Sequence, residues 1–233
     1  MRALSESGSS DGVGRLSEKS LHKTIKYYLE PNEAYHEVKL LGSIADIKNP
    51  RGIYEVQTRS AYKLRGKIEK FLEQSSVCLV LPLAAKKTVS WVSRETGEIS
   101  PPRKSTKSEG VYDALYELSA LSDLLGREGF SVKLLFLDVS EYKYLGRGGK
   151  KWGAERMERI ANSVIAERDI SSVSELLPLI SDIPKEEFSS KELSRVTGRT
   201  GRRAFYITKF LLDLALIERV GKSGRAFIYK RKF

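Results

Sequence analysis

The chain has 233 residues, of which 40% are hydrophobic and 30% charged, and this balance excludes a wholly disordered chain. No apolar run reaches the roughly 18 residues that span a bilayer, and the N-terminus lacks the apolar stretch of a secretory signal, so we expect a cytoplasmic protein with no membrane partner. The 41 Lys and Arg residues against 30 Asp and Glu give a net charge of +11, which favours a polyanion such as nucleic acid as partner.

Positive charge is concentrated near the C-terminus. The last 48 residues hold 12 basic and 5 acidic side chains, whereas the preceding 185 hold 29 and 25. The first 15 residues are rich in Ser and Gly, which is typical of disorder. We therefore divide the chain into a disordered tail (1–15), an N-terminal domain (16–170) and a basic C-terminal domain (171–233).

The N-terminal domain opens with a predicted helix. Ser17 is a candidate N-cap, and apolar side chains from Leu21 to Leu29 recur at helical spacing before Pro31 ends the helix. Three extended segments then follow with turn residues between them, and we expect an antiparallel meander. The segments are 36–41, 44–47 and 53–58.

Further along the chain, residues 60–74 return to helical spacing with Ser60 as a candidate cap. An apolar run at 77–83 contains the single cysteine, Cys78, and predicts a buried strand with a structural thiol. One cysteine excludes disulfides within the chain and cysteine-based zinc sites. We also expect a hairpin at 87–92 and 98–99, a helix at 111–125, a strand at 130–139 and a mobile surface loop at 146–153.

Polar residues follow the second and third strands of the meander. Because side chains alternate along a strand, Glu55 and Gln57 share a face, and Asp46 on the neighbouring strand can join them. Apolar neighbours such as Ile44 and Ile47 indicate that these side chains sit within a buried sheet. An isolated buried carboxylate is costly, so Asp46 and Glu55 need a metal ion or a cation.

The order helix, three-strand meander, helix and buried strand, together with Asp46 and Glu55-Val56-Gln57, resembles the PD-(D/E)XK nuclease superfamily. The stretch from Gly42 to Ile47 is similar to the core of archaeal Holliday junction resolvases and related restriction endonucleases. The resemblance implies an α/β fold with a restriction endonuclease-like mixed sheet flanked by helices. It also implies a metal-dependent DNA endonuclease.

For the site, the resemblance implies that the carboxylates of Asp46 and Glu55 and the carbonyl of Val56 bind Mg²⁺ or Mn²⁺, which acidifies the attacking water. Gln57 stands where the superfamily usually has Lys, and its amide can orient a water but cannot supply charge. Glu18, on the first helix, is the candidate to orient a metal-bound water or a second ion.

Auxiliary residues extend this prediction. Arg59 or Lys63 can supply the charge that Gln57 lacks, and Glu37 on the first strand is a weaker candidate ligand. His22 lies four residues after Glu18 on the same helix face, where an active-site role and a structural hydrogen bond are equally favoured. Glu18 to His22, Asp46 and Glu55 to Thr58 also resemble motifs of a group of uncharacterised prokaryotic proteins.

The C-terminal domain has the pattern of a winged helix-turn-helix. A first helix at 173–180 precedes a short helix at 191–196 capped by Ser190, a turn at Gly198 and a longer helix that begins at Thr200. Two strands, 217–220 and 226–229, then form the wing. In this fold the longer helix enters the DNA major groove and the wing contacts the backbone.

Six basic residues on this helix and wing are therefore the predicted DNA contacts. They are Arg199, Arg202, Arg203, Lys209, Lys222 and Arg225.

Other functions stay open at this point. Because Gln57 replaces Lys, the chain can instead be a DNA-binding regulator or a structural protein whose nuclease-like domain has lost catalysis. An RNA-directed enzyme is a weaker alternative. Many enzymes with this resemblance act as dimers, and a homodimer is compatible with the sequence.

Overall fold

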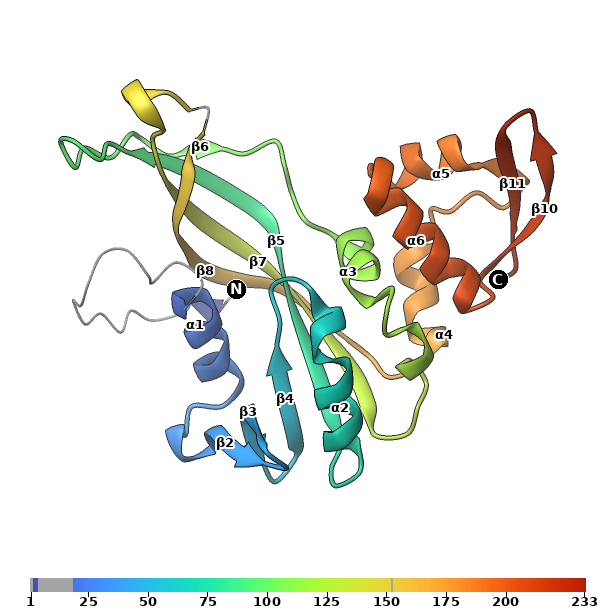
Figure 1. The fold of residues 1–233 in the computed structure, drawn as a ribbon, viewed down its shortest axis with the longest axis horizontal. Helices are drawn as coiled ribbons and strands as arrows, with labels where there is room; N and C mark the ends of the chain where they lie inside the picture. The colour runs from blue at the N-terminus through green and yellow to red at the C-terminus, as the bar shows by residue number, and fades with distance from the viewer. Residues whose placement is uncertain (1, 4–18, 152) are drawn as a thin grey trace.

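The computed structural model describes residues 2–3, 19–151 and 153–233. A mixed β-sheet forms the centre of the molecule and helices flank it, so the α/β class expected from the sequence is confirmed (Figure 1). Seven strands lie in the order β1-β8-β7-β5-β4-β3-β2, and β6 pairs with β5. None of the described helices is long and apolar enough to cross a bilayer.

The predicted meander is confirmed. After helix α1 (Lys19–Leu29), strands β2 (His36–Leu40), β3 (Ser43–Asn49) and β4 (Gly52–Val56) pair in antiparallel fashion. The predicted helix start at Ser17 lies outside the described residues. Gly52 opens β4 at φ +139°, and a Cβ there would meet Ser76 Oγ at 2.4 Å, so only glycine fits this turn.

A helical crossover follows the meander. The short 3₁₀ helix η2 (Ala61–Leu64) and helix α2 (Arg65–Leu72) lead into β5 (Val77–Val92), which runs parallel to β4. Ser60 stands at the N-cap of η2 as expected, but its backbone is left-handed at φ 58° and its side chain makes no capping bond. Burial raises the pKa of the Cys78 thiol to about 11, in agreement with a structural thiol.

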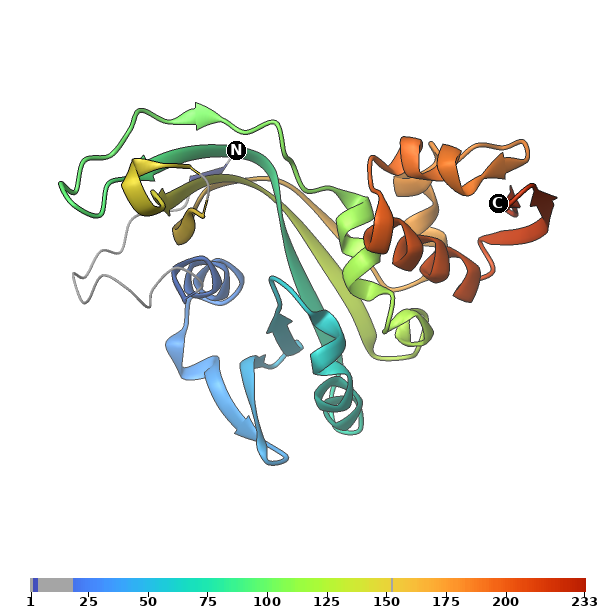
Figure 2. The same ribbon diagram turned by 45° about the horizontal axis from the view of Figure 1, so that its top comes forward.

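The sheet extends far beyond the predicted strands. The parallel pair of β5 and β7 (Phe130–Tyr144) is joined by antiparallel β8 (Glu155–Ile170), which the sequence did not predict. Charged residues interrupt the alternation along β8, and three register shifts against β7 hide its period. We call the outer part of these strands, residues 86–92, 139–144 and 155–161, the arm; Figure 2 shows it curving over α1.

Smaller elements complete this part of the chain. The predicted helix at 111–125 is shorter than expected, because it divides into α3 (Val111–Leu118) and the 3₁₀ helix η3 (Ser122–Leu124). The loop at 146–153 holds a 3₁₀ turn, η4 (Arg147–Gly149). The two-residue strands β1 (Arg2–Ala3) and β6 (Arg103–Lys104) lie along β8 and β5.

The C-terminal elements follow the predicted order. Helix α4 (Val173–Leu176) and 3₁₀ helix η5 (Leu177–Ile180) precede β9 (Phe188–Ser189), α5 (Ser190–Thr197), α6 (Gly201–Asp213), β10 (Ile217–Ser223) and β11 (Ala226–Arg231). Gly198 makes the expected left-handed turn at φ 63°. The cap of α5 is Ser189 rather than Ser190: its Oγ accepts the Glu192 N–H in a capping box.

One contiguous cluster of buried side chains joins the sheet to the C-terminal elements. It runs from Leu79 and Leu134 in the strands through Leu115 of α3 to Ile207 and Phe210 of α6. Helices α3 and α6 pack against each other, as Figure 1 shows. The two predicted domains therefore share a core.

An ion-pair cluster reinforces the contact between α3 and α6. Asp113, only 7% exposed, accepts hydrogen bonds from the Arg199 Nε at 2.8 Å and from the Arg203 Nη1 at 2.9 Å. The same carboxylate accepts the Gly110 N–H at 2.9 Å and so also caps α3. Its loss would leave two arginines and a helix end without their acceptor.

Replacing the Asp113 carboxylate tests whether the sheet and the C-terminal elements unfold together. Asp113→Ala should lower the free energy of unfolding by about 2–3 kcal/mol and keep a single transition, because partly buried cations lose their partner. Urea denaturation followed by circular dichroism measures both quantities. The matched control is Asp123→Ala, which removes a more exposed ion pair with Arg65 and should cost under about 1 kcal/mol. Two separate transitions would contradict a shared core.

Candidate active site

The site begins where β3 and β4 stop pairing. Ile47 lies opposite Tyr54, so the next residues along, Asp46 and Glu55, lie opposite each other. The Asp46 N–H donates to Glu55 Oε1 at 3.3 Å, and the Val56 N–H donates to Asp46 Oδ2 at 2.8 Å. We call this pair of bonds the carboxylate exchange. In these two bonds a side-chain carboxylate, rather than a backbone carbonyl, accepts the backbone N–H of the opposite strand. The backbone pairing of β3 and β4 ends here.

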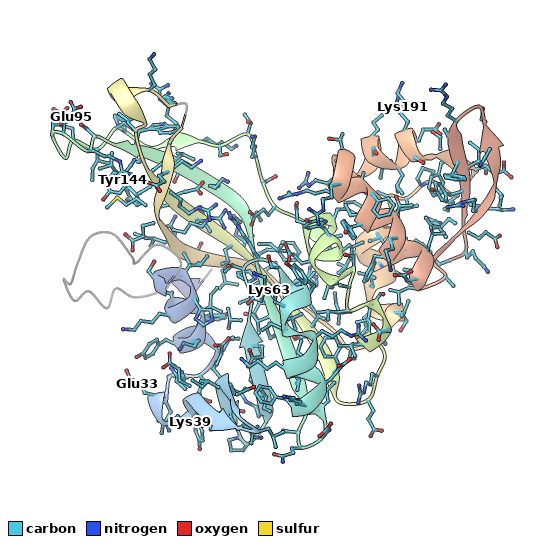
Figure 3. All side chains as sticks on the ribbon, in the orientation of Figure 1. Glu33, Lys39, Lys63, Glu95, Tyr144 and Lys191 are labelled. Atoms are coloured by element: carbon cyan, nitrogen blue, oxygen red, sulfur yellow. The ribbon has the colours of Figure 1, made fainter. Side chains whose placement is uncertain are left out.

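A surface cavity of about 550 Å³ lies at this point. Helix α1, strands β3 and β4, the segment after β4, and helices η2 and α2 all contribute to its wall, and Lys63 is labelled near the centre of Figure 3. The lining residues are His22, Asp46, Glu55, Val56, Gln57, Thr58, Arg59, Ser60, Lys63, Leu64 and Lys67.

Glu55 is the most deeply buried charge of this cavity. Its side chain is 1% exposed, and the Lys67 Nζ donates to its Oε2 at 2.5 Å. Burial, with the negative charge of Asp46, raises the pKa of Glu55 to about 7 in spite of Lys67. Near neutral pH this carboxyl is therefore present in both protonation states.

The pKa of Asp46 moves in the opposite direction. Burial pushes its pKa upward, but the hydrogen bond and charge of His22 and the Val56 N–H outweigh burial and hold the pKa below its usual value. The His22 Nε2 lies 3.1 Å from Asp46 Oδ2. Two opposed carboxyl groups with pKa values moved in opposite directions are typical of sites that perform acid–base or metal chemistry.

The structure brings together most of the residues predicted for the site. Asp46, Glu55, Val56 and Gln57 line the cavity, as do the auxiliary residues His22, Arg59 and Lys63. The Gln57 Nε2 donates to the carbonyl oxygen of Arg59, which fixes its amide beside the carboxylates. Glu18 lies outside the described residues.

Glu37 was predicted as an auxiliary ligand, and the structure places it elsewhere. Its side chain is 72% exposed and accepts a hydrogen bond from the Lys26 Nζ at 3.0 Å. It is absent from the described lining of the cavity. The reason is its position on β2, the outermost strand, two strands away from β4.

Lys67 is the functional residue that sequence reasoning missed. The charge missing at Gln57 was assigned to Arg59 or Lys63, but the described ion pair to Glu55 comes from Lys67 on α2. Lys67 lies four residues after Lys63, one helical turn further along, so the two share a helix face. Helical spacing from Lys63 would have identified it.

The oxygen atoms of this site are of the kind that a divalent cation prefers. Within the described residues, no three side chains of His, Cys, Asp or Glu converge as a metal site. Asp46, Glu55 and the Val56 carbonyl nevertheless form a set of hard oxygen donors, and burial first, then the charge of Asp46, raises the pKa of Glu55 in spite of Lys67. These residues fit Mg²⁺ or Mn²⁺ if the Lys67 ammonium gives up its place on Glu55.

A second cavity of about 360 Å³ continues from the first. The two share Gln57, Thr58, Arg59 and Ser60, and the second reaches Arg203 of α6. Residues 57–60 thus separate the carboxylates from the C-terminal elements.

The six predicted DNA contacts divide into two groups. Arg199 and Arg203 bind Asp113, so their charges hold α6 on α3. Lys209 pairs with Asp213, and the other three lie on exposed parts of α6 and the hairpin β10–β11. Aromatic rings support two of these side chains: the Arg202 guanidinium lies 5.5 Å from the Tyr206 ring and the Lys222 Nζ 4.9 Å from the Phe227 ring, whereas Arg225 stands in the turn between β10 and β11.

Comparison with known proteins identifies a family. Residues 19–174, which include every lining residue of the first cavity, match the family described as "Domain of unknown function (DUF8091)". The chain belongs to the DUF8091 family. An "Uncharacterized protein" of Treponema pallidum (strain Nichols) is 30% identical over 228 residues, which cover 94% of this chain and 88% of that protein. No solved structure matches the chain.

The DUF8091 match covers the site and the sheet but not α5, α6 and the hairpin β10–β11. The likeness to the Treponema protein extends over 94% of the chain and so includes much of these elements as well. We infer that the cavity is a property of the DUF8091 region, to which the C-terminal elements are joined.

The pKa of Glu55 gives a pH-dependent stability. Folding raises this pKa from 4.5 to about 7, so the native state binds more protons than the unfolded state between these values. The contribution of Glu55 to stability should therefore fall as pH rises through this window, by about 3 kcal/mol in total. Urea unfolding of wild type and Glu55→Gln at pH 5 and pH 8 measures the difference.

Glu55→Gln should lose this pH dependence and gain stability relative to wild type at pH 8. Glu37→Gln is the control, because that exposed carboxylate should leave the pH dependence of wild type almost unchanged. Equal pH slopes for wild type and Glu55→Gln would contradict the raised pKa.

Proposed function

We propose that the protein is a metal-dependent DNA endonuclease of the restriction endonuclease-like type. The observation that carries the proposal is the pair of opposed carboxylates, Asp46 and Glu55, at the point where β3 and β4 separate, with Lys67 bound to Glu55. A phosphodiester is a dianionic centre in its transition state, and a site for its hydrolysis needs both metal-binding oxygens and cations. This cavity supplies both.

The order of the elements supports the same proposal. Helix α1, the meander β2-β3-β4, helix α2 and parallel strand β5 follow the succession expected for a PD-(D/E)XK core. The carboxylates come from the second and third strands of that meander, as the resemblance requires. Lys67 provides from α2 the charge that a strand lysine at position 57 would have provided.

The proposed roles follow from the contacts. Asp46, Glu55 and the Val56 carbonyl hold Mg²⁺ or Mn²⁺, which when bound acidifies the attacking water and offsets developing charge. His22 orients the Asp46 carboxylate through their hydrogen bond at 3.1 Å. Gln57, fixed by its bond to the Arg59 carbonyl, orients the water. Lys67, released from Glu55, places its ammonium beside the phosphate.

The C-terminal elements supply DNA binding in this proposal. Two helices and a hairpin in this order are those of a winged helix, with α6 as its recognition helix. Since Arg199 and Arg203 hold α6 on α3, we assign the contacts to the exposed Arg202, Lys209, Lys222 and Arg225. These side chains bind phosphates and so give affinity that depends on salt.

A cleavage assay tests the assigned roles. Purified protein should nick supercoiled plasmid or branched DNA with Mg²⁺ or Mn²⁺, and Asp46→Asn should lower the rate by about a hundredfold or more, because a ligand charge is lost. Lys67→Met should lower the rate with little effect on DNA binding. Glu37→Gln keeps the cavity intact and should cleave like wild type. Cleavage undiminished in Asp46→Asn would remove the site assignment.

One observation favours the alternative of a DNA-binding regulator with an inactive nuclease-like domain. Both oxygens of Glu55 accept bonds from the chain itself, Oε1 from the Asp46 N–H and Oε2 from Lys67. A site neutralised in this way keeps its shape without a metal ion. The carboxylates would then serve stability alone.

Calorimetry separates the two functions. Titration of Mn²⁺ into wild type should give heat of binding that Glu55→Gln removes, and binding should release protons near pH 7 because Glu55 must ionise. Protons are counted from the dependence of the heat on the ionisation enthalpy of the buffer. Identical heats in wild type and Glu55→Gln would favour the inactive domain.

A further inference from the structure

The arm carries a buried carboxylate surrounded by cations. Glu141 on β7 is 1% exposed, and four basic side chains from β5, β7 and β8 surround it. The nearest nitrogens are Arg156 Nε at 2.8 Å, Lys87 Nζ at 3.4 Å, Arg159 Nε at 3.5 Å and Lys143 Nζ at 3.7 Å. We call these five residues the Glu141 cluster.

Positive charge exceeds negative charge in this cluster. Arg159 also pairs with Glu109 at 3.2 Å, so four cations meet two carboxylates. Glu141 Oε2 and Arg159 Nε are buried without a hydrogen-bond partner among the described residues, although both lie within ion-pair distance. The arm therefore carries more positive charge than Glu141 and Glu109 neutralise.

The pKa of Arg156 also reflects the excess of positive charge around it. Burial first, then repulsion from Arg159 and Arg59, lowers the pKa of Arg156 below its usual value. Arg59 belongs to the lining of the candidate active site. The field of the Glu141 cluster therefore reaches the edge of that cavity.

The cluster also faces helix α1, which contributes His22 to the cavity. Val139 and Ala161, two residues before Glu141 and two after Arg159, pack with Leu21 and Ile25 of α1. Side chains two residues apart share a face of a strand, so Glu141 and Arg159 point to the α1 side as well. The Ser20 Oγ on α1 donates to the Arg159 carbonyl at 3.0 Å. Ser20 lies two residues before His22, which lines the cavity.

The arm curves over α1 in Figure 2, and Tyr144, labelled in Figure 3, is the last residue of its strand β7. Arg156 and Lys143 are the open members, with side chains 27% and 30% exposed. A nucleic-acid strand carries a phosphate about every 3.4 Å of helix axis, so a strand with one phosphate in the cavity brings others to the neighbouring surface.

We propose that Arg59 and the Glu141 cluster form a phosphate-binding track that holds the DNA backbone beyond the scissile phosphate. The choice of DNA rests on the proposed function, whereas the anion site rests on the cluster itself. Arg156 and Lys143 contact the phosphates, and Glu141 partly neutralises the cations of the cluster. The arm is then part of the substrate site.

Binding without catalysis tests this track. Fluorescence anisotropy with a labelled DNA duplex in EDTA compares wild type with the double variant Lys143→Gln and Arg156→Gln. Affinity should fall about tenfold or more, and the slope of log K against log salt should become shallower by about two, because two phosphate contacts are lost. The control is Lys133→Gln on the same strand β7, whose ammonium pairs with Glu167 and Asp169 away from the cavity and should leave both quantities unchanged.

A second variant separates the track from a merely structural cluster. Glu141→Gln removes a carboxylate that competes with phosphate for the cations, so DNA binding should strengthen even where stability falls. Weakened binding in Glu141→Gln, or an unchanged salt slope in the double variant, would overturn the track. Displacement of the probe by RNA but not by DNA would overturn the choice of DNA.

These outcomes are independent of cleavage. If wild type cuts no DNA with Mg²⁺ or Mn²⁺ but the double variant still loses affinity in EDTA, the endonuclease proposal fails and the track stands. If cleavage is seen and the double variant binds like wild type, the track alone fails.

Discussion

The carboxylate exchange between β3 and β4 is the constraint on which the site depends. Asp46 accepts from the backbone of β4 and Glu55 accepts from the backbone of β3, so each carboxylate is fixed by the opposite strand. Buried like charges placed face to face require cations, and this requirement explains why His22 and Lys67 reach in from helices on the two sides. A cavity with a defined polar wall is the result.

The arm also has a cluster of buried charges, but there the cations outnumber the carboxylate. In the cavity two carboxylates are held by one lysine and one histidine, whereas on the arm one carboxylate lies among four cations. Negative charge is thus concentrated in the cavity and positive charge on the arm. A phosphodiester backbone with a bound metal ion is complementary to this arrangement, because the metal satisfies the cavity and the phosphates satisfy the arm.

Local signals in the sequence predicted the meander, helix α2 and the positions of Asp46 and Glu55, because alternation and turn residues determine them. Two features escaped. Strand β8 is stabilised by its long pairing with β7, and its charged residues belong to the Glu141 cluster, so its own sequence shows no clear period. Lys67 lies twelve residues from Glu55, and only the packing of α2 on the sheet shows that they meet. Glu37 is the opposite case: it lies on the strand where the sequence placed it, but that strand is at the edge of the sheet and its carboxylate does not reach the cavity.

The buried cluster that runs from the sheet through α3 into α6 holds α6 in a fixed position relative to the candidate site. Because Asp113 and the shared core fix α6 relative to β4, a duplex bound to α6 as in the proposed function would present one set of backbone positions to the cavity. Any cut would fall at a constant offset from the bound segment, whatever the sequence there. The geometry of the shared core, rather than a flexible tether, then decides which bond is within reach.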